Sequence, residues 1–238
     1  MDIKHLPHQI IAKKELFSDL FNLVPFSSHI KDATSGKYLA MNQASLELLG
    51  FSTANEIIGL TVNDLAIQRS GCWDKTFPDY VIDLDHQAIT SHNTAMIQHS
   101  FLNNQGFVRI EKLVKIPILN EKKNKTIGLL SFGEDLTFNV NLLFLFNNYK
   151  KFYLNKNEMI LKFLQFLKID QFFLILPTQT ELRLLLAMKL NDSYKFLAKS
   201  LNISIKTVES HRNNLKEKVS VNLLHLALIL RNGMVNNE

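Results

Sequence analysis

The sequence of 238 residues contains a single cysteine, Cys72. One cysteine excludes an internal disulfide and any zinc cluster built from several cysteines. The longest apolar runs, such as Leu142–Phe146 and Leu226–Leu230, are far shorter than the roughly 20 residues that a membrane-spanning helix needs. The first ten residues, MDIKHLPHQI, lack the apolar centre of a signal peptide. We therefore expect a cytoplasmic protein without a membrane partner, in which Cys72 has a packing role.

Motifs of the common enzyme classes are missing as well. There is no glycine-rich phosphate loop, no His-Glu-x-x-His motif and no nucleophile elbow around a serine. The histidines are scattered and follow no ligand spacing, so no metal site is expected. The sequence therefore predicts a protein that is not an enzyme.

Charge is spread unevenly along the chain. With 46% apolar and 21% charged residues, the chain can bury a sizeable core. Residues 1–136 carry 13 basic and 15 acidic residues, a net charge of −2. Residues 137–176 carry 5 and 2, and residues 177–238 carry 9 and 5, which gives net charges of +3 and +4. This asymmetry predicts two modules, with any polyanionic partner at the second.

The first half of the chain alternates extended runs and short helices. Residues 1–22 are predicted to be one helix that covers the next module or a partner's copy of it. Residues 23–136 begin with two extended runs around a turn made by Asp32, Ser35 and Gly36. Two short helices end at glycines, and Thr61 opens another helix. The remaining elements expected are a helix over Tyr80–Ile89 and strands over Thr94–Leu102, Phe107–Ile118 and Thr126–Phe132.

Residues 23–136 resemble a PAS domain. The stretch HIKDATSGKYLAMNQASLELLGFSTANEIIGLTVNDLA, the later Gly106 and the closing GLLSFGEDLT carry the resemblance. It implies a five-stranded antiparallel sheet with helices on one face, and in many members a ligand cavity between them. The candidate pocket residues are Tyr38, Met41, Leu113 and Leu130, although the same residues could equally fill a closed core.

No cofactor is predicted for this module, and haem and flavin both stay open. His86 and His92 lie in the region that supplies the axial ligand in haem-binding PAS domains, but a solvated or capping histidine is the simpler interpretation. Cys72 lies in RSGCWDK, which does not fit the reactive-cysteine helix of flavin photosensors. Trp73 can line a pocket or anchor the core.

Residues 137–172 form a connector of two apolar helices. Leu142, Leu145, Phe146 and Tyr149 share one face of the first, and Ile160, Phe163, Leu164 and Leu167 share one face of the second. Helices this apolar do not stay exposed. They can pack on the PAS sheet or form a homodimer seam.

The last segment, residues 173–238, contains two short helices joined by a tight turn. Tyr194–Leu201 is followed by Asn202 and Ile203, and Ser204 then caps a helix to Val219. Val208, Leu215 and Val219 share one face of this helix. The opposite face carries Lys206, Ser210, Asn213 and Glu217. A second helix with compact polar groups facing outward is typical of a helix-turn-helix.

The same segment resembles the LuxR-type helix-turn-helix family through LPTQTELRLLLAM and FLAKSLNISIKTVESHRNNLKEKV. The resemblance implies four helices, sequence-specific binding of double-stranded DNA and dimerisation through the last helix. Its helix-turn-helix segment runs from Lys195 to Asn214. The residues that the resemblance assigns to DNA binding are Lys206, Thr207, Glu209, Ser210, His211, Asn213, Asn214, Lys216 and Lys218.

Two further roles follow from position in this segment. Arg212 lies near the packed side, so it can pair internally with Glu181 or contact a phosphate. On the last helix, Leu223, Leu226, Ala227 and Leu230 form an apolar stripe that can serve as a dimer seam. The segment departs from the family in lacking the glycine after its first helix and in placing Phe196 where an acid is usual.

The expected protein is therefore of the α+β class: a PAS-like sheet domain, a helical connector and an all-α, four-helix LuxR-type domain. The expected function is a sequence-specific DNA-binding transcription regulator, which the family resemblance implies to be a dimer. Its PAS domain is expected to sense a small ligand or a partner and to control the helix-turn-helix. The alternative is a PAS-based interaction adaptor whose helix-turn-helix has lost DNA affinity. A gel shift distinguishes the two.

Overall fold

The computed structural model describes residues 21–232, which divide between Thr137 and Phe138 into two compact units. The helix predicted over residues 1–22 lies outside the described residues, apart from the helical Phe21 and Asn22. The first unit contains β1 (Ser28–Asp32), β2 (Tyr38–Met41), α3 (Gln43–Leu49), η1 (Ala54–Glu56), α4 (Val62–Gln68), α5 (Phe77–Ser91), β3 (Ala95–Leu102), β4 (Val108–Leu119) and β5 (Thr126–Asp135).

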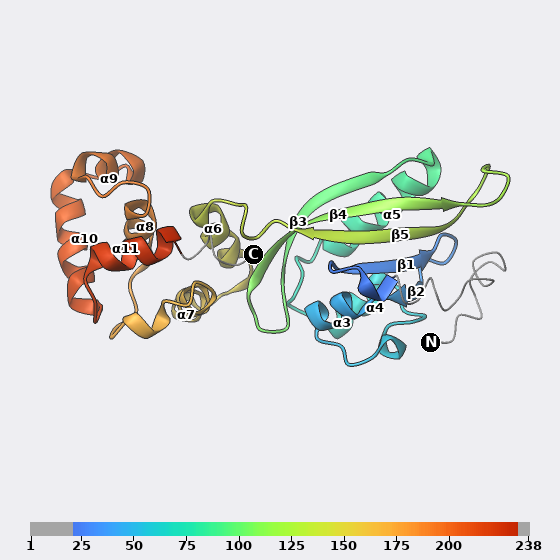
Figure 1. Ribbon diagram of the computed structural model, residues 1–238, viewed down its shortest axis with the longest axis horizontal. Coiled ribbons are helices and arrows are strands. Elements are labelled where there is room, and N and C mark those ends of the chain that lie inside the picture. Colours follow the sequence, from blue (N-terminus) through green and yellow to red (C-terminus); the bar gives the residue numbers. More distant parts are fainter. Residues whose placement is uncertain (1–20, 233–238) are drawn as a thin grey trace. The chain divides into compact units, whose positions relative to one another are not determined.

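The five strands form one antiparallel sheet in the order β2-β1-β5-β4-β3 (Figure 1). The helices α3, α4 and α5 lie against it, and α5 packs on β3, β4 and β5. The predicted α+β class and the five-stranded antiparallel sheet are confirmed.

Local sequence signals fix several of these elements. The carboxylate of Asp32 accepts a hydrogen bond from the amide of Ser35 at 2.7 Å, which closes the β1–β2 turn. Gly50 ends α3 in the left-handed region, with φ of 73°. Thr61 caps α4 by accepting from the amide of Asp64, as its position in the sequence predicts.

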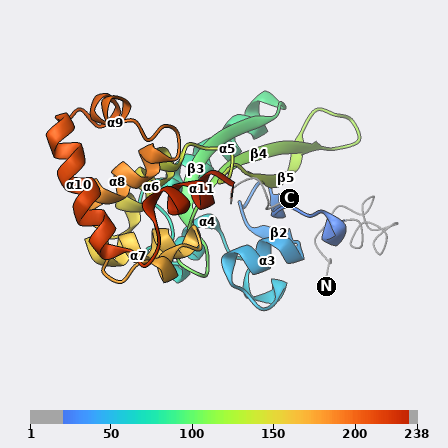
Figure 2. The same cartoon turned by 60° about the vertical axis from the view of Figure 1, so that its left-hand side comes forward.

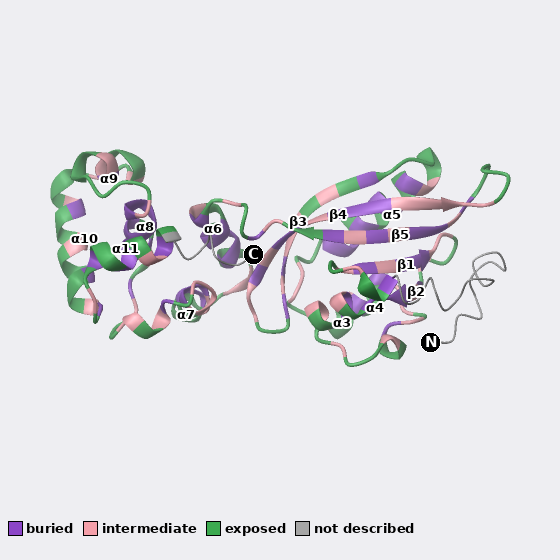
Figure 3. Ribbon diagram, viewed as in Figure 1, coloured by how far each residue is buried: buried purple, intermediate pink, exposed green. Residues whose placement is uncertain are grey.

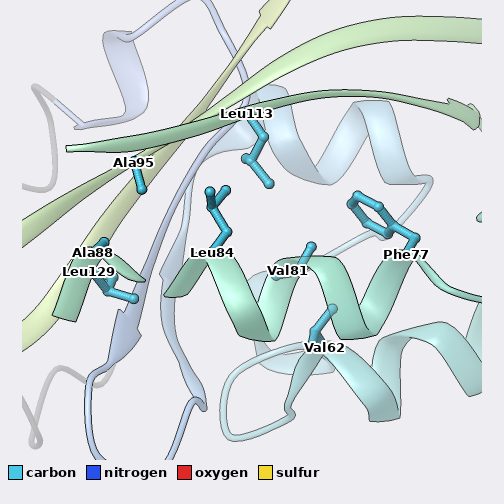
Figure 4. Packing of buried hydrophobic residues seen from close by; sticks show 8 residues of the cluster. All are labelled: Val62, Phe77, Val81, Leu84, Ala88, Ala95, Leu113 and Leu129. Atoms are coloured by element: carbon cyan, nitrogen blue, oxygen red, sulfur yellow. The ribbon is translucent and has the colours of Figure 1, made fainter. Parts of the chain in front are cut away.

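The core of the first unit lies between the sheet and α5. Figure 4 shows buried side chains from α4, α5 and three strands converging there. The members are Val62, Phe77, Val81, Leu84, Ala88, Ala95, Leu113 and Leu129. A second cluster, built on Phe21, Ile30 and Ala40, includes Ile118 and Leu130. Since Leu130 directly follows Leu129 on β5, the two side chains point to opposite faces of the sheet.

The second unit is helical. It contains α6 (Leu142–Phe152), α7 (Lys156–Phe166), η2 (Asp170–Phe172), α8 (Gln179–Met188), α9 (Tyr194–Leu201), α10 (Ile205–Lys218) and α11 (Leu223–Asn232), seen from two sides in Figures 1 and 2. Within residues 21–232, none of the helices has both the length and the apolar character required to cross a membrane.

The apolar faces of α6 and α7 pack against each other. The ring of Phe163 lies 5.0 Å from that of Phe146 and 5.2 Å from that of Tyr149, measured between centroids. Apart from the half-buried Leu167, these side chains are buried within the second unit, so they cannot form the homodimer seam that one of the two sequence-based alternatives expected. The two stripes bury each other, and α6 also contacts α8.

A short backbone pairing joins the segment at the end of η2 to the end of α10. Phe173 and Val219 form an antiparallel bridge, and the amide of Ser220 donates to the carbonyl of Phe172 at 2.9 Å. The amide of Leu174 donates to the carbonyl of Lys218 at 2.8 Å. These bonds fix the C-terminal end of α10 within its unit.

Candidate nucleic-acid interface and ligand cavity

The helices α9 and α10 are joined by a tight turn with caps on both sides. Asn202 ends α9 in the left-handed region, with φ of 55°. The hydroxyl of Ser204 then accepts from the amide of Thr207 at 3.0 Å and starts α10. The predicted N-cap at Ser204 is confirmed. Contacts of α8 with both α9 and α10 complete a helix-turn-helix arrangement.

One face of α10 is buried and the opposite face is open. Val208 and Leu215 are fully buried, and Val219 beyond the end of the helix is 8% exposed. Figure 3 shows the rest of α10 as mostly exposed. The exposed polar residues are Lys206, Glu209, Ser210, Asn213, Asn214, Lys216 and Glu217. The 3.6-residue period of the sequence identified these two faces.

The outward polar groups of α10 are free to bind a partner. Across residues 21–232, no hydrogen bond or ion pair engages the side chains of Lys206, Ser210, Asn213 or Lys216. Thr207 and His211 are half-buried at the edge, and the hydroxyl of Thr207 lies 2.7 Å from that of Ser204.

Lys218 has a different environment from the other lysines of α10. Its ammonium group lies 2.7 Å from the carboxylate of Glu181, whose side chain is only 4% exposed. The same carboxylate accepts from the amide of Thr178 and so closes the cap of α8. Burial opposes ionisation of Glu181, but the bonds from Lys218 and Thr178 outweigh it and lower the pKa of the carboxyl. Lys218, which the family resemblance assigned to DNA, holds α10 to α8 through this pair.

Arg212 does not pair with Glu181, the internal partner that the sequence suggested. Its guanidinium donates to the carbonyl of Asp192 at 3.2 Å and lies over the ring of Tyr194, 5.2 Å from the centroid. Glu181 is paired with Lys218 instead. Arg212 therefore has the internal role that was one of its two expected roles, but its partners are different. It joins α10 to the loop before α9.

The stripe proposed as a dimer seam on α11 lies inside the monomer. Each of its four side chains is at most 4% exposed, because α11 packs on α8 through this face. They are Leu223, Leu226, Ala227 and Leu230. These residues cannot form a seam, because they already fill the core of their own unit. The apolar residues that α11 leaves open are Leu224 and Leu228, 44% and 48% exposed.

The first unit encloses a cavity of about 50 Å³ between the sheet and its helices. Tyr38, Met41 and Leu113, three of the four candidate pocket residues, line it. Leu130 does not, because it faces the other side of the sheet with Ile30 and Phe21. That part of the pocket prediction is wrong.

An aromatic series forms one side of the cavity. The ring of Phe77 lies 5.4 Å from that of Trp73 and 4.2 Å from that of His99, and His99 lies 5.5 Å from Phe101. The imidazole of His99 also lies 2.9 Å from the carboxylate of Glu111. A side chain at Gly133 would collide with this carboxylate, so the glycine makes room for Glu111.

Sequence reasoning missed the polar residues of the cavity. His29, His99, Glu111 and Lys115 all line it, whereas the histidines considered as haem ligands do not. Both His86 and His92 are exposed on α5 and at its end. Among residues 21–232, no three side chains of His, Cys, Asp or Glu converge as a metal site would require. His29 of β1 and Lys115 of β4 are far apart in the sequence. They come together because both strands pair with β5.

Two lysines beside this cavity share one carboxylate. Lys31 of β1 lies 2.7 Å from one oxygen of Asp85 on α5, and Lys115 of β4 lies 2.9 Å from the other. Burial opposes the charge on Lys31, but Tyr38 and Asp85 outweigh it and raise the pKa of that lysine. For Lys115, burial and the charge of Lys31 prevail and lower the pKa to about 7. Burial, with both lysines nearby, also holds the pKa of His29 well below its ordinary value.

No family model and no curated protein matches the chain. Solved structures of VqmA match it. The complex of Vibrio cholerae VqmA with ligand and DNA is 22% identical, covers 95% of this chain and 89% of its own, and has a TM-score of 0.50. A phage VqmA in complex with DPO is 18% identical, covers 97% and 94%, and has a TM-score of 0.51.

The chain has the fold of VqmA. The similarity to VqmA includes both units, so a sheet unit followed by a helical unit is common to these chains. A further structure, the Vibrio cholerae VqmA dimer without target DNA, is described among LuxR-type receptors; it is 20% identical, covers 94% and 87%, and has a TM-score of 0.43.

Proposed function

We propose that the chain is a dimeric, sequence-specific DNA-binding transcription regulator whose sheet unit holds a small ligand that controls the helix-turn-helix. The observation that carries the proposal is the open face of α10. Its amide, hydroxyl and ammonium groups are exposed and uncommitted, while the opposite face is fixed in the core. A helix of this kind fits the major groove of DNA, where such groups meet base edges and phosphates.

The residues of α10 then divide into four roles. Asn213 and Ser210, with Glu209 beside them, read base edges, since an amide can make two hydrogen bonds to adenine. Lys206 and Lys216 neutralise phosphates. Thr207, His211 and Asn214 flank the reading face and contact the groove walls. Lys218 and Arg212 position the helix through Glu181, Asp192 and Tyr194.

The cavity supports the sensor part of the proposal. It lies between the sheet and its helices, and aromatic and polar side chains both line it. Vibrio cholerae VqmA forms a complex with ligand and DNA, and phage VqmA forms a complex with DPO. By this fold-level analogy we propose that a small molecule occupies the cavity and changes DNA binding.

As a dimer, the protein would bind a DNA site with two-fold symmetry. Two reading helices must lie about one helical turn of DNA apart, so the spacing between protomers decides whether both can bind. Leu224 and Leu228 are four residues apart on α11 and both exposed, so they offer an apolar patch for a second copy.

The proposal is tested by selecting bound fragments from a random DNA library at low salt and measuring affinity with variants. Asn213→Ala is expected to weaken discrimination at one base by about 1–3 kcal/mol. Lys216→Ala is expected to weaken all sequences equally and to lower the salt slope by about 1. Asn147→Ala, an exposed asparagine of α6, is the matched control and should change neither quantity.

Two results would count against the proposal. Failure to retain any fragment at low salt would favour the interaction adaptor. Footprints that protect a single half-site at every protein concentration would remove the dimer and leave monomeric DNA binding.

A further inference from the structure

Two fully buried lysines surround a single carboxylate in the first unit. The side chains of Lys31 and Lys115 are both 0% exposed, and that of Asp85 is 12% exposed. Each ammonium group takes one of the two oxygens of Asp85, at 2.7 and 2.9 Å. A buried charge requires a partner, and here two cations divide one anion between them.

The ammonium groups of the two lysines differ in their hydrogen bonds. Lys31 donates a hydrogen bond to Asp85, and its ammonium group also lies over the ring of Tyr38, 4.9 Å from the centroid. Lys115 is at ion-pair distance, but the atoms are not aligned for a hydrogen bond. Counting acceptors from residues 21–232, the ammonium group of Lys115 therefore makes no hydrogen bond. Of the two lysines, Lys115 is the one that lines the cavity.

The other carboxylate near Lys115 is that of Glu111, and its charge favours the protonated lysine without offsetting burial and the charge of Lys31. On β1 and β2, His29 is half-buried and Tyr38 is buried, and loss of hydration favours the neutral form of each, lowering the pKa of the first and raising that of the second. Lys31, also on β1, adds positive charge. On β3 and β4, the carboxylate of Glu111 lies 2.9 Å from the imidazole of His99. Asp85, on α5, is shared as described.

We propose that the cavity takes a small organic acid, which binds in its ionised form with an anionic oxygen on the ammonium group of Lys115. This rests on the proposed function, since it names the ligand class of the proposed sensor. The anion would complete the charge pairing of the two lysines and accept the hydrogen bonds that Lys115 lacks. Leu113 and the rings of Trp73 and Phe77 would contact the apolar part of the acid.

Proton linkage follows from this arrangement. The pKa of Lys115 is about 7 in the free protein, and a bound anion raises it. Below about pH 7, affinity for the ionised acid is constant, because Lys115 already carries its proton. Above that pH, binding must take up a proton, and affinity falls by up to about tenfold per pH unit.

Isothermal titration calorimetry of the full chain tests the proposal. The probes are acetate and propionate, each beside its neutral primary amide, at about pH 6 and about pH 8. The acids should bind and the amides should not. Acid affinity should be weaker at the higher pH, where proton uptake appears as a dependence of the measured heat on the buffer.

Lys115→Met is the matching variant and should lose at least about tenfold in acid affinity together with the pH dependence. Lys112→Met is its control, because Lys112 lies on the same strand with a side chain that is 39% exposed and 3.5 Å from Glu134. Should Lys115→Met fail to fold, the pH profile of the unaltered chain decides.

Four outcomes overturn the inference. Amides that bind as tightly as acids, or an acid affinity independent of pH above about 7, exclude an ionised ligand while the sensor function stands. Unchanged acid binding by Lys115→Met excludes Lys115 as the contact. If neither acids nor neutral molecules bind at millimolar concentration, both the inference and the proposed sensor function fall.

Discussion

Lysine side chains lie in opposite environments in the two units. Lys31 and Lys115 are fully buried between a sheet and a helix. Lys206 and Lys216 are exposed on α10 without a partner among the described residues. Lys218 lies between these extremes, with a 21% exposed side chain paired to Glu181.

The difference shows how environment decides what a cation does. An exposed ammonium keeps its hydration, adds little to stability and remains available for a phosphate. A buried ammonium loses its hydration, so it must find an anion or give up its proton. The lysines of α10 therefore suit a partner outside the chain, and those of the sheet suit an anion inside it.

Asp85→Asn should produce the largest effect, because it leaves two buried ammonium groups without a carboxylate between them. We expect the first unit to lose about 3–5 kcal/mol of unfolding free energy. Urea unfolding followed by the fluorescence of Trp73, the only tryptophan of the chain, reports this unit.

Asp83→Asn is the control for this change, since Asp83 is exposed on the same helix. It should stay within about 0.5 kcal/mol of the unaltered chain. Equal unfolding curves for the two variants would show that Asp85 does not hold the buried lysines.

Much of the fold could be predicted from the sequence because its signals are local. The caps at Thr61 and Ser204 and the turn at Asp32 need only neighbouring residues, and each is formed as expected. The pocket residue Leu130 was misplaced because both faces of β5 are covered by apolar residues. Polar alternation, which would show the direction of each side chain, is lost in such a strand.

The site was harder to predict because it depends on contacts between distant residues. Arg212 and Lys218 lie on opposite flanks of α10, and the sequence does not reveal which flank faces Glu181. The apolar stripe at Leu226 was assigned to a dimer, although a small helical unit needs it for its own core. Lys31 and Lys115 have no local sign of burial, since lysine is seldom buried.

Lys218→Ala should have an intermediate effect. It leaves the nearly buried carboxylate of Glu181 without its cation, so we expect the second unit to lose about 1.5–3 kcal/mol of stability. Lys216→Ala removes an exposed, unpaired lysine of the same helix and should change stability by less than about 0.5 kcal/mol. Thermal unfolding followed by circular dichroism compares them. Similar losses in both variants would contradict the division between positioning and phosphate-binding lysines.

Lys115→Met should produce the smallest effect, a change in how the free energy of unfolding depends on pH. Between about pH 7 and the ordinary lysine value of about 10.4, the unfolded chain binds a proton that the folded chain lacks. The lowered pKa of Lys115 therefore makes stability rise with pH in this window, by about 1 kcal/mol per unit. Below about pH 7 both states hold the proton and the contribution is constant. Urea unfolding of both chains at several pH values isolates this slope as their difference, and parallel profiles would mean that Lys115 keeps its proton in the folded chain.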